Sequence, residues 1–429
     1  MACLFVATFS LALSALTHQS CNPCAIGQCR HQTSGQEVRI IRRKCRFCPD
    51  ALPFRSATSI LRKSLSCAPC LTYGDVMPYS ALPPPAFWKR CRDSADFRLD
   101  ALYAPKVALH PGLRIATAGS CFAQNIATYV RASTLTLVEA EPAPALMPGD
   151  VARRYGYGLF SARYGNVYTA RQLRQLLEDA ESATVHDAAV WRRRDAWIDA
   201  LRPNVEPDGF QTEAELCAFR RDHLRRVRAM FDETDVFVFT LGLTECWADR
   251  ATGLVFPTAP GVLGGHFDPD QHVFVNQSFA EVHEDLTEAI ARMRLWNPEL
   301  KVLLTVSPVP LTATASGDHI LSATTYSKSV LRAVAGEVAA LDPDIDYVPS
   351  YEIITGTPFG AQFYNDNLRT VTAEGVATVM SVFFGAHPEL GGVPRPDIVI
   401  SDPQSEPAPQ EDICEEALLE AFAPPEHIR

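Results

Sequence analysis

Residues 113–133 read LRIATAGSCFAQNIATYVRAS and combine a short apolar run, a turn of small residues and a helical pattern. The apolar run at 115–118 predicts a buried strand. Apolar side chains then recur with the spacing of one helix face, at Phe122, Ile126 and Val130. A strand, a tight turn and a helix in this order are typical of α/β folds. They place Ser120 beyond the carboxyl edge of a sheet, where such folds bind ligands.

Two interpretations of Ser120 are open. The N–H groups of a first helical turn have no partner inside the helix, so they favour negative charge that forms near the serine. This is the arrangement of a nucleophile elbow, although the pattern G-x-S-x-G is absent. The alternative is a strand-to-helix turn in which Ser120 only caps the helix.

Further strands and helices alternate along the chain. Short apolar runs predict buried strands at 135–138, 236–240, 302–306 and 347–349. Helical patterns follow a cap at Thr169 and occupy 213–230, 279–296 and 322–341. This alternation predicts a three-layer α/β/α fold with a doubly wound, mostly parallel sheet of about five strands. We interpret 188–211 as a surface excursion and 257–276, rich in Gly and Pro, as a long loop that forms a lid.

The net charge of −11 is divided unevenly along the chain. Residues 1–76 hold nine Lys/Arg and three Asp/Glu, a balance of +6, so the remaining 30 basic and 47 acidic residues give −17. An acidic body argues against nucleic acid as a partner. Because no run of eighteen apolar residues is present, we expect no membrane span and a soluble, cytoplasmic protein.

Residues 1–76 also differ from the rest of the chain in cysteine content. They contain eight of the 13 cysteines, and six of these form C-x-x-C pairs, Cys21/Cys24, Cys45/Cys48 and Cys67/Cys70. Such pairs can hold zinc. The absence of sustained periodicity instead favours an over-extended reading frame, with the true start at Met77. A disordered tail is a third interpretation. A secretory signal at 4–16 comes last, since no basic segment precedes it.

Several short segments of the sequence are shared with one known family. They are GSCFA at 119–123, PYSALPPPAFWK at 78–89, YGNVYT at 164–169, TE at 244–245 and SPVPL at 307–311. In these segments the chain resembles the GSCFA family, whose members are relatives of the SGNH/GDSL hydrolases. The resemblance implies an SGNH-like, flavodoxin-like domain over 77–390. It would lie between the basic extension and an acidic, Pro/Glu-rich tail at 391–429 that we expect to be mostly disordered.

The resemblance also implies roles for individual residues. Ser120 is the expected nucleophile, Gly165 the expected donor of an oxyanion N–H group, and Asn166 a second amide donor. Gly165 and Asn166 can equally form a structural turn. Thr244 stands where SGNH relatives carry an oxyanion-binding asparagine, and its hydroxyl can donate one hydrogen bond. Cys121 is grouped with the substrate-binding residues and is the rival nucleophile, because helix N-termini activate thiols.

The proton acceptor of the SGNH pattern is missing from its expected place. SGNH-type enzymes take it from D-x-x-H ahead of the last helix, whereas residues 367–370 read NLRT. Two replacements are open. His319, in the loop after the fourth strand, is the first, with a helix-capping role as its alternative. A carboxylate, Glu245 or Glu352, is the second.

Three functions follow from these residues. The first is a serine-dependent acyl esterase or acyltransferase acting on a carbohydrate or other hydroxyl-bearing substrate. The second is a catalytically degenerate SGNH-like fold that binds a glycan or an acylated ligand. The third is a zinc-dependent interaction protein that uses the amino-terminal cysteines. We expect no cofactor, and no metal in the body of the chain, where the loop residues His266, Asp268, Asp270 and His272 lack ligand spacing.

Overall fold

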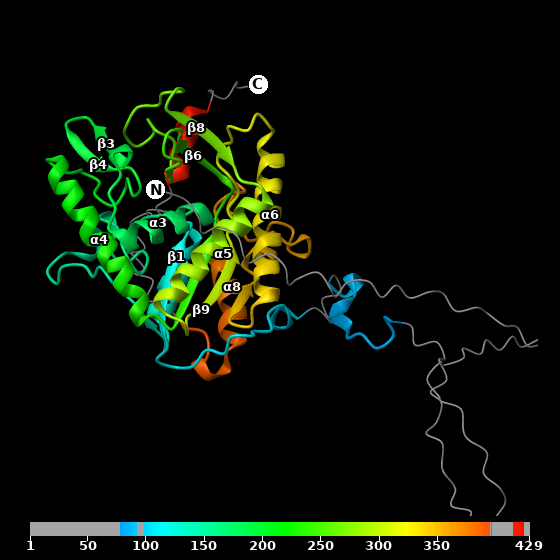
Figure 1. Ribbon diagram of the computed structural model, residues 1–429. Helices are drawn as coiled ribbons and strands as arrows, with labels where there is room; N and C mark the ends of the chain where they lie inside the picture. Colours follow the sequence, from blue (N-terminus) through cyan, green and yellow to red (C-terminus); the bar gives the residue numbers. More distant parts are fainter. Residues whose placement is uncertain (1–77, 92–97, 395, 397–414, 424–429) are drawn as a thin grey trace, which may run out of the picture. The chain divides into compact units, whose positions relative to one another are not determined.

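Five parallel strands form the central sheet of the computed structural model, in the order β10-β9-β5-β1-β2 (Figure 1). The structure describes residues 78–91, 98–394, 396 and 415–423. The strands are β1 (Arg114–Gly119), β2 (Thr136–Leu137), β5 (Val236–Leu241), β9 (Lys301–Val306) and β10 (Ile345–Val348). Each lies where an apolar run predicted a strand, so the predicted parallel sheet is confirmed.

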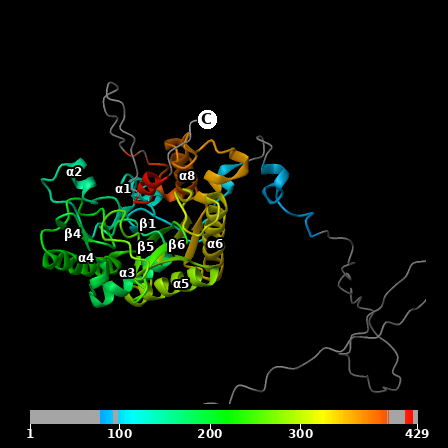
Figure 2. The ribbon, with the colours of Figure 1, turned by 90° about the horizontal axis from the view of Figure 1, so that it is seen from above.

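Helices cover both faces of this sheet, and the domain therefore has three layers (Figure 2). One layer contains α3 (Ala170–Ser182), α4 (Glu213–Glu233), α5 (Phe279–Trp296) and α6 (Ile320–Leu341). The other contains α1 (Phe122–Arg131), α7 (Ser350–Thr355) and α8 (Ala373–Gly385). Successive strand residues point to opposite faces, so Phe237 and Phe239 pack in the first layer, whereas Val236 and Val238 pack in the second. The predicted α/β/α architecture is confirmed.

Two small antiparallel sheets lie in segments that the sequence left irregular. The hairpin β3 (Val190–Arg193) and β4 (Ala196–Asp199) falls within the predicted surface excursion. A second sheet joins β6 (Glu245–Asp249), β7 (Val255–Phe256) and β8 (His272–Asn276) in the order β7-β6-β8. β8 occupies the end of the predicted lid loop. Its pairing with β6 joins residues far apart in sequence, so the local sequence pattern did not predict this strand.

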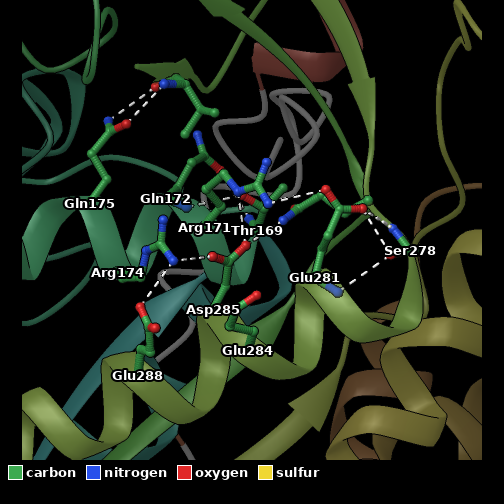
Figure 3. Close-up of polar contacts among 12 residues, drawn as sticks. Thr169, Arg171, Gln172, Arg174, Gln175, Ser278, Glu281, Glu284, Asp285 and Glu288 are labelled. Atoms are coloured by element: carbon green, nitrogen blue, oxygen red, sulfur yellow. Dashed lines mark hydrogen bonds and ion pairs between the residues drawn. The ribbon is translucent and has the colours of Figure 1, made fainter. Parts of the chain in front are cut away.

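Paired charges fasten α3 to α5, and Figure 3 shows the contacts. The buried carboxylate of Asp285 accepts hydrogen bonds from Arg171 Nε at 2.9 Å and from Gln277 Nε2 at 2.6 Å, and it lies 2.8 Å from Arg174 Nη1. At its amino end α3 is closed by Thr169 and Gln172, which form the predicted cap as a capping box. These contacts fix the start of α3, which matters because Tyr168, just before it, contacts the site described below.

The remaining helices are short. They are α2 (Gly149–Arg154) and the 3-10 helices η1 (Pro84–Ala86), η2 (Trp88–Cys91), η3 (Leu99–Ala101), η4 (Asp187–Ala189), η5 (Thr357–Phe359), η6 (Pro388–Leu390) and η7 (Glu415–Phe422). No helix in the described part of the chain is both long and apolar enough to cross a membrane.

The chain divides into two units, Met1–Met77 and Pro78–Arg429. The zinc, reading-frame, disorder and signal interpretations of 1–76 concern residues outside those that the structure describes. Of the predicted tail at 391–429, the structure describes 391–394, 396 and 415–423. The outer domain limits therefore stay predictions.

Candidate active site

The winding of the sheet reverses at β1, because β2 lies on one side of it and β5, β9 and β10 lie on the other. Doubly wound sheets bind ligands beyond the carboxyl ends of the strands at such a reversal. Ser120 follows β1 and Gly242 follows β5, so both residues lie at this edge. They are also in contact, since a Cβ added to Gly242 would lie 3.0 Å from Ser120 Cβ. We call this place the Ser120 crevice.

The turn before Ser120 requires glycine. Gly119 has φ +139°, and a Cβ there would lie 2.5 Å from the carbonyl oxygen of Thr240 on β5. This close approach lets Ser120 N–H donate to the same carbonyl at 3.1 Å, while Ser120 O accepts from Ala123 N–H at 2.8 Å. The backbone of Ser120 is thereby held between β5 and the first turn of α1, whose amino end favours negative charge.

The hydroxyl of Ser120 is held differently from its backbone. Its side chain is buried, with the residue 2% exposed, and Oγ has no hydrogen-bond partner among the described residues. Most buried hydroxyls in folded proteins have one. The capping role that was the alternative interpretation of Ser120 therefore has no hydrogen bond to support it in this structure.

The YGNVYT segment, 164–169, lies against the turn that carries Ser120. Val167 N–H donates to Gly119 O at 2.9 Å, which brings this segment against the turn. Gly165 has φ +69°, in the left-handed region that favours glycine. The buried Asn166 accepts a hydrogen bond through Oδ1 from Gln124 Nε2 at 3.5 Å. Gln124 was not predicted as a site residue, although its position one helical turn after Ser120 was a usable signal.

The loop after β5 is held by two neighbouring elements. Gly242 N–H donates to Tyr168 O at 2.8 Å, and Lys328 Nζ of α6 donates to Gly242 O at 2.5 Å. Lys328 is only 2% exposed, so an amine lies buried beside the loop that touches Ser120. The sequence interpretation missed it. Its place on the face of α6 that also carries the buried Leu331 and Ala335 was the available signal.

Thr244 has both of its donors engaged within the protein. Its N–H donates to Ser327 Oγ at 3.0 Å, and its hydroxyl donates to Asn276 Oδ1 at 2.7 Å. The hydroxyl that the sequence assigned to an oxyanion is therefore occupied by Asn276 in this structure. An oxyanion role for Thr244 requires that bond to open.

The candidate bases lie in different surroundings. His319 is the exposed N-cap of α6, and its Nδ1 accepts from Leu321 N–H at 3.2 Å. It lies nine positions before Lys328, which corresponds to about 13.5 Å of helix rise, so the two side chains are far apart along α6. Glu352 is bonded to Arg332 and, at 2.8 Å, to Tyr347 Oη, so its carboxylate is already paired.

Glu245, the other carboxylate candidate, lies in β6. Burial raises its pKa, while hydrogen bonds from Thr314 and from the Ala315 backbone oppose that rise. Thr314 Oγ1 donates to Glu245 Oε1 at 2.7 Å. Glu245 and Leu243, the residue after Gly242, both line a cavity of about 210 Å³. Glu245 therefore belongs to a space next to the Ser120 crevice.

Residues 367–370, which stand at the D-x-x-H position, close a turn. Asn367 Oδ1 accepts from the N–H groups of Arg369 and Thr370, both at 3.0 Å, and from Thr370 Oγ1 at 3.1 Å. Asn365 Nδ2 donates to the same Thr370 hydroxyl at 2.8 Å. Amides and hydroxyls of this kind satisfy one another but supply no proton acceptor near neutral pH.

The structure does not bring metal ligands together either. No group of three or more His, Cys, Asp or Glu within the described ranges could hold an ion.

Solved structures that resemble this chain share little of its sequence. A carbohydrate esterase family 3 protein from Talaromyces cellulolyticus is 9% identical, with a TM-score of 0.31 over 63% of this chain and 94% of that chain. A variant of an acetyl esterase with an acetate ion is 10% identical, with a TM-score of 0.28 over 62% and 92%. A Parabacteroides merdae protein described as GDSL-like is 12% identical, with a TM-score of 0.29 over 66% and 100%. No curated protein matches the chain.

The model of the GSCFA family matches residues 114–383. This range contains the Ser120 turn, the YGNVYT segment, the loop after β5 and the turn at 367–370. It also covers more than half of the 429 residues. As the shared sequence segments predicted, the chain belongs to the GSCFA family.

Proposed function

We propose that this protein is a serine-dependent acyl esterase or acyltransferase that acts on a carbohydrate or another hydroxyl-bearing substrate, with Ser120 as its nucleophile. The observation that carries the proposal is the buried Ser120 hydroxyl, which has no partner in the described part of the chain. Burying a hydroxyl without a hydrogen bond is unfavourable. Such a group at the ligand-binding edge of a doubly wound sheet is best explained by a reaction or a ligand that uses it.

The proposed reaction follows from this placement. Ser120 Oγ attacks the acyl carbon while its proton passes to a base, and the former carbonyl oxygen becomes negatively charged. The amino end of α1, the Gly165 backbone and the Asn166 amide are the groups that would stabilise this oxyanion. Collapse of the intermediate breaks the ester bond and protonates the departing alkoxide. Water or an acceptor hydroxyl then attacks the acyl-serine and releases the acyl group.

Three side chains compete for the role of base. His319 and Glu245 are the candidates from sequence, and Lys328 is the candidate from structure because it contacts the loop that touches Ser120. A neutral lysine amine can take a serine proton, as in hydrolases with a Ser–Lys pair. The base is identified by the variant that loses turnover while it still binds substrate.

A binding protein without turnover is the second candidate function. The turn at 367–370 favours it, because its polar groups satisfy one another and leave no acid–base pair at the D-x-x-H position. The ligand would then be a glycan or an acylated molecule held in the Ser120 crevice.

Hydrolysis of a panel of simple esters, from acetate to hexanoate, tests the proposal. We expect wild type and Cys121→Ala to turn over at least one ester, and Ser120→Ala to turn over none. His319→Ala, Glu245→Gln and Lys328→Met then assign the base, which should cost about 10²–10⁴-fold in kcat when removed. Ligand binding that is equal in wild type and Ser120→Ala, with no turnover of any ester, would support the binding protein instead.

A further inference from the structure

Three aromatic side chains form part of the wall of the cavity beside the Ser120 crevice. Its volume is about 210 Å³, and Trp247, Phe256 and Phe274 line it together with Ala259 and Ala313. An apolar cavity of roughly 150 Å³ is already large enough to hold benzene. The space therefore suits one aromatic ring with a short substituent.

The three rings belong to one face of the small sheet. Trp247 of β6 is directly opposite Phe256 of β7 and directly opposite Phe274 of β8. Residues that face each other across strands share a side of the sheet, and the rings of Trp247 and Phe274 meet edge to face at 5.7 Å. A flat ligand ring would find both ring edges and ring faces to pack against.

This cavity lies next to the loop that contacts Ser120. Leu243 forms part of its wall, and the preceding residue, Gly242, contacts Ser120. An ester whose acyl carbon lies at Ser120 could therefore extend one of its two arms past Leu243. The cavity is placed to hold a part of the substrate that does not react.

Three polar side chains, Thr258, Glu245 and Thr314, line this space beside its apolar residues. Thr258 is 7% exposed, and its hydroxyl has no hydrogen-bond partner among the residues described. Glu245 is 8% exposed, and its carboxylate accepts hydrogen bonds from Thr314 Oγ1, through Oε1, and from the Ala315 backbone. A ligand hydroxyl could donate to the Glu245 carboxylate and accept from Thr258. A plain hydrocarbon ring would leave the Thr258 hydroxyl unsatisfied.

We infer that this cavity is a subsite for a hydroxylated aromatic ring carried by the ester that Ser120 attacks. The inference rests on the proposed function and names a substrate class for it. The ring can belong to the acyl part or to the alcohol part of the ester, since the cavity recognises only the ring and its hydroxyl. Remote binding of this kind orients the reacting carbonyl and raises the rate beyond what the ester group alone achieves.

Calorimetric titration with two probes tests the subsite without any turnover. The probes are 4-hydroxycinnamic acid for the acyl arm and 4-hydroxybenzyl alcohol for the alcohol arm. Ala259→Trp fills the cavity, and Ala251→Trp, in the exposed turn between β6 and β7, is its matched control. We expect wild type and Ala251→Trp to bind at least one probe, and Ala259→Trp to bind it at least about 10-fold more weakly. If Ala259→Trp does not fold, Ala313→Trp fills the cavity from its exposed rim.

The hydroxyl is tested separately with Thr258→Val, which keeps the side-chain shape. Wild type should prefer the hydroxylated probe over the matching ring without a hydroxyl by about 10-fold, and the variant should lose most of that preference. Absence of binding for both probes, or equal binding in the filled variant, would overturn the subsite.

Two esters then locate the ring and separate this inference from the proposed function. Faster turnover of methyl 4-hydroxycinnamate than of methyl acetate assigns the ring to the acyl arm. Faster turnover of 4-hydroxybenzyl acetate than of methyl acetate assigns it to the alcohol arm. If wild type binds a ring probe, the filled variant does not, and no ester is turned over, the subsite is supported and the esterase activity is contradicted.

Discussion

The Ser120 crevice and the charge network between α3 and α4 are both polar and both shielded from solvent, yet their groups are paired differently. The members of the charge network are Glu141, Asp179, Asp199, Arg202, Arg220 and His223. Arg220 lies 3.1 Å from Asp179 and 3.6 Å from Asp199, and Arg202 Nε donates to Asp199 at 2.7 Å. In the crevice, by contrast, Ser120 Oγ has no partner in the described ranges, whereas His223 of the network lacks one at Nε2 but is bonded to Glu141 through Nδ1.

This difference separates groups that maintain the fold from groups kept for a ligand. A buried charge is tolerated only when opposite charges and hydrogen bonds surround it, so each member of the network depends on its neighbours. An unpaired hydroxyl adds nothing to stability and can be removed without harm to the fold. Substitutions in the network should therefore change stability, whereas substitutions in the crevice should change activity.

The largest expected effect is that of Ser120→Ala on catalysis. We expect kcat for any ester substrate to fall by about 10⁴-fold or more, because the covalent step loses its oxygen. The midpoint of urea unfolding should stay the same, since the lost hydroxyl had no partner within the described residues. A clear drop in that midpoint would place Ser120 with the structural groups and would weaken the comparison.

Arg220→Ala should have the largest effect on stability. It leaves the buried carboxylates of Asp179 and Asp199 without one of their cations, and we expect the free energy of unfolding to fall by about 3–5 kcal/mol. Arg225→Ala, on the same helix, is the matched control. It breaks an exposed pair with Asp222 and should change the unfolding free energy by less than about 1 kcal/mol. Equal losses in the two variants would show that the buried network stabilises the fold no more than an exposed ion pair does.

Gly242→Ala tests the contact between the two loops of the crevice. The added Cβ would lie 3.0 Å from both Ser120 Cβ and Tyr168 O, so Ser120 or the loop must move. A misplacement of about 1 Å can cost about 10²-fold, so a shift of a few tenths of an ångström should lower kcat by about 10-fold. Gly385→Ala, at the end of α8 with nothing within 4 Å of its added Cβ, is the control and should leave kcat unchanged.

The network should also make stability depend on pH. Burial, together with Arg202, lowers the pKa of His223 to about 4, and the neutral ring is held 2.7 Å from Glu141. Between pH 6.5 and 4 the unfolded chain binds a proton that the folded chain excludes. The free energy of unfolding should therefore fall by about 2–3 kcal/mol as the pH drops through that range.

Urea unfolding at pH 7 and pH 4.5 measures this effect. His223→Asn keeps a donor toward Glu141 without a group that titrates, so it should lose most of the pH dependence in that interval. A wild-type stability that rises on acidification would contradict the expected loss.

Much of the fold could be predicted from the sequence, because its signals are local. Each central strand is an apolar run, and Thr169 was recognisable as a cap from its position before an amphipathic helix. The small sheet β7-β6-β8 could not be predicted in the same way. Its middle strand pairs Trp247 with Phe256 and Phe274, and such partners are set by tertiary contacts rather than by neighbours in sequence.

The site was predictable only where backbone geometry dictates residue type. Gly119 and Gly165 have positive φ values, and the Ser120 turn followed from its small residues. The sequence marks Lys328 only by its place on the apolar face of α6, and it does not mark Thr258, because the loop or cavity that each side chain reaches is set by folding. His319 shows the opposite case. The sequence offered both a catalytic and a capping role, and in this structure it caps α6.

Labelling with a fluorophosphonate probe tests most directly whether Ser120 is a nucleophile. The probe is applied to the full chain, and the modified residue is mapped by mass spectrometry. We expect one label per chain, on Ser120, that is absent from Ser120→Ala and kept by Cys121→Ala. A folded wild-type chain without label, or a label confined to another residue, would contradict the serine mechanism.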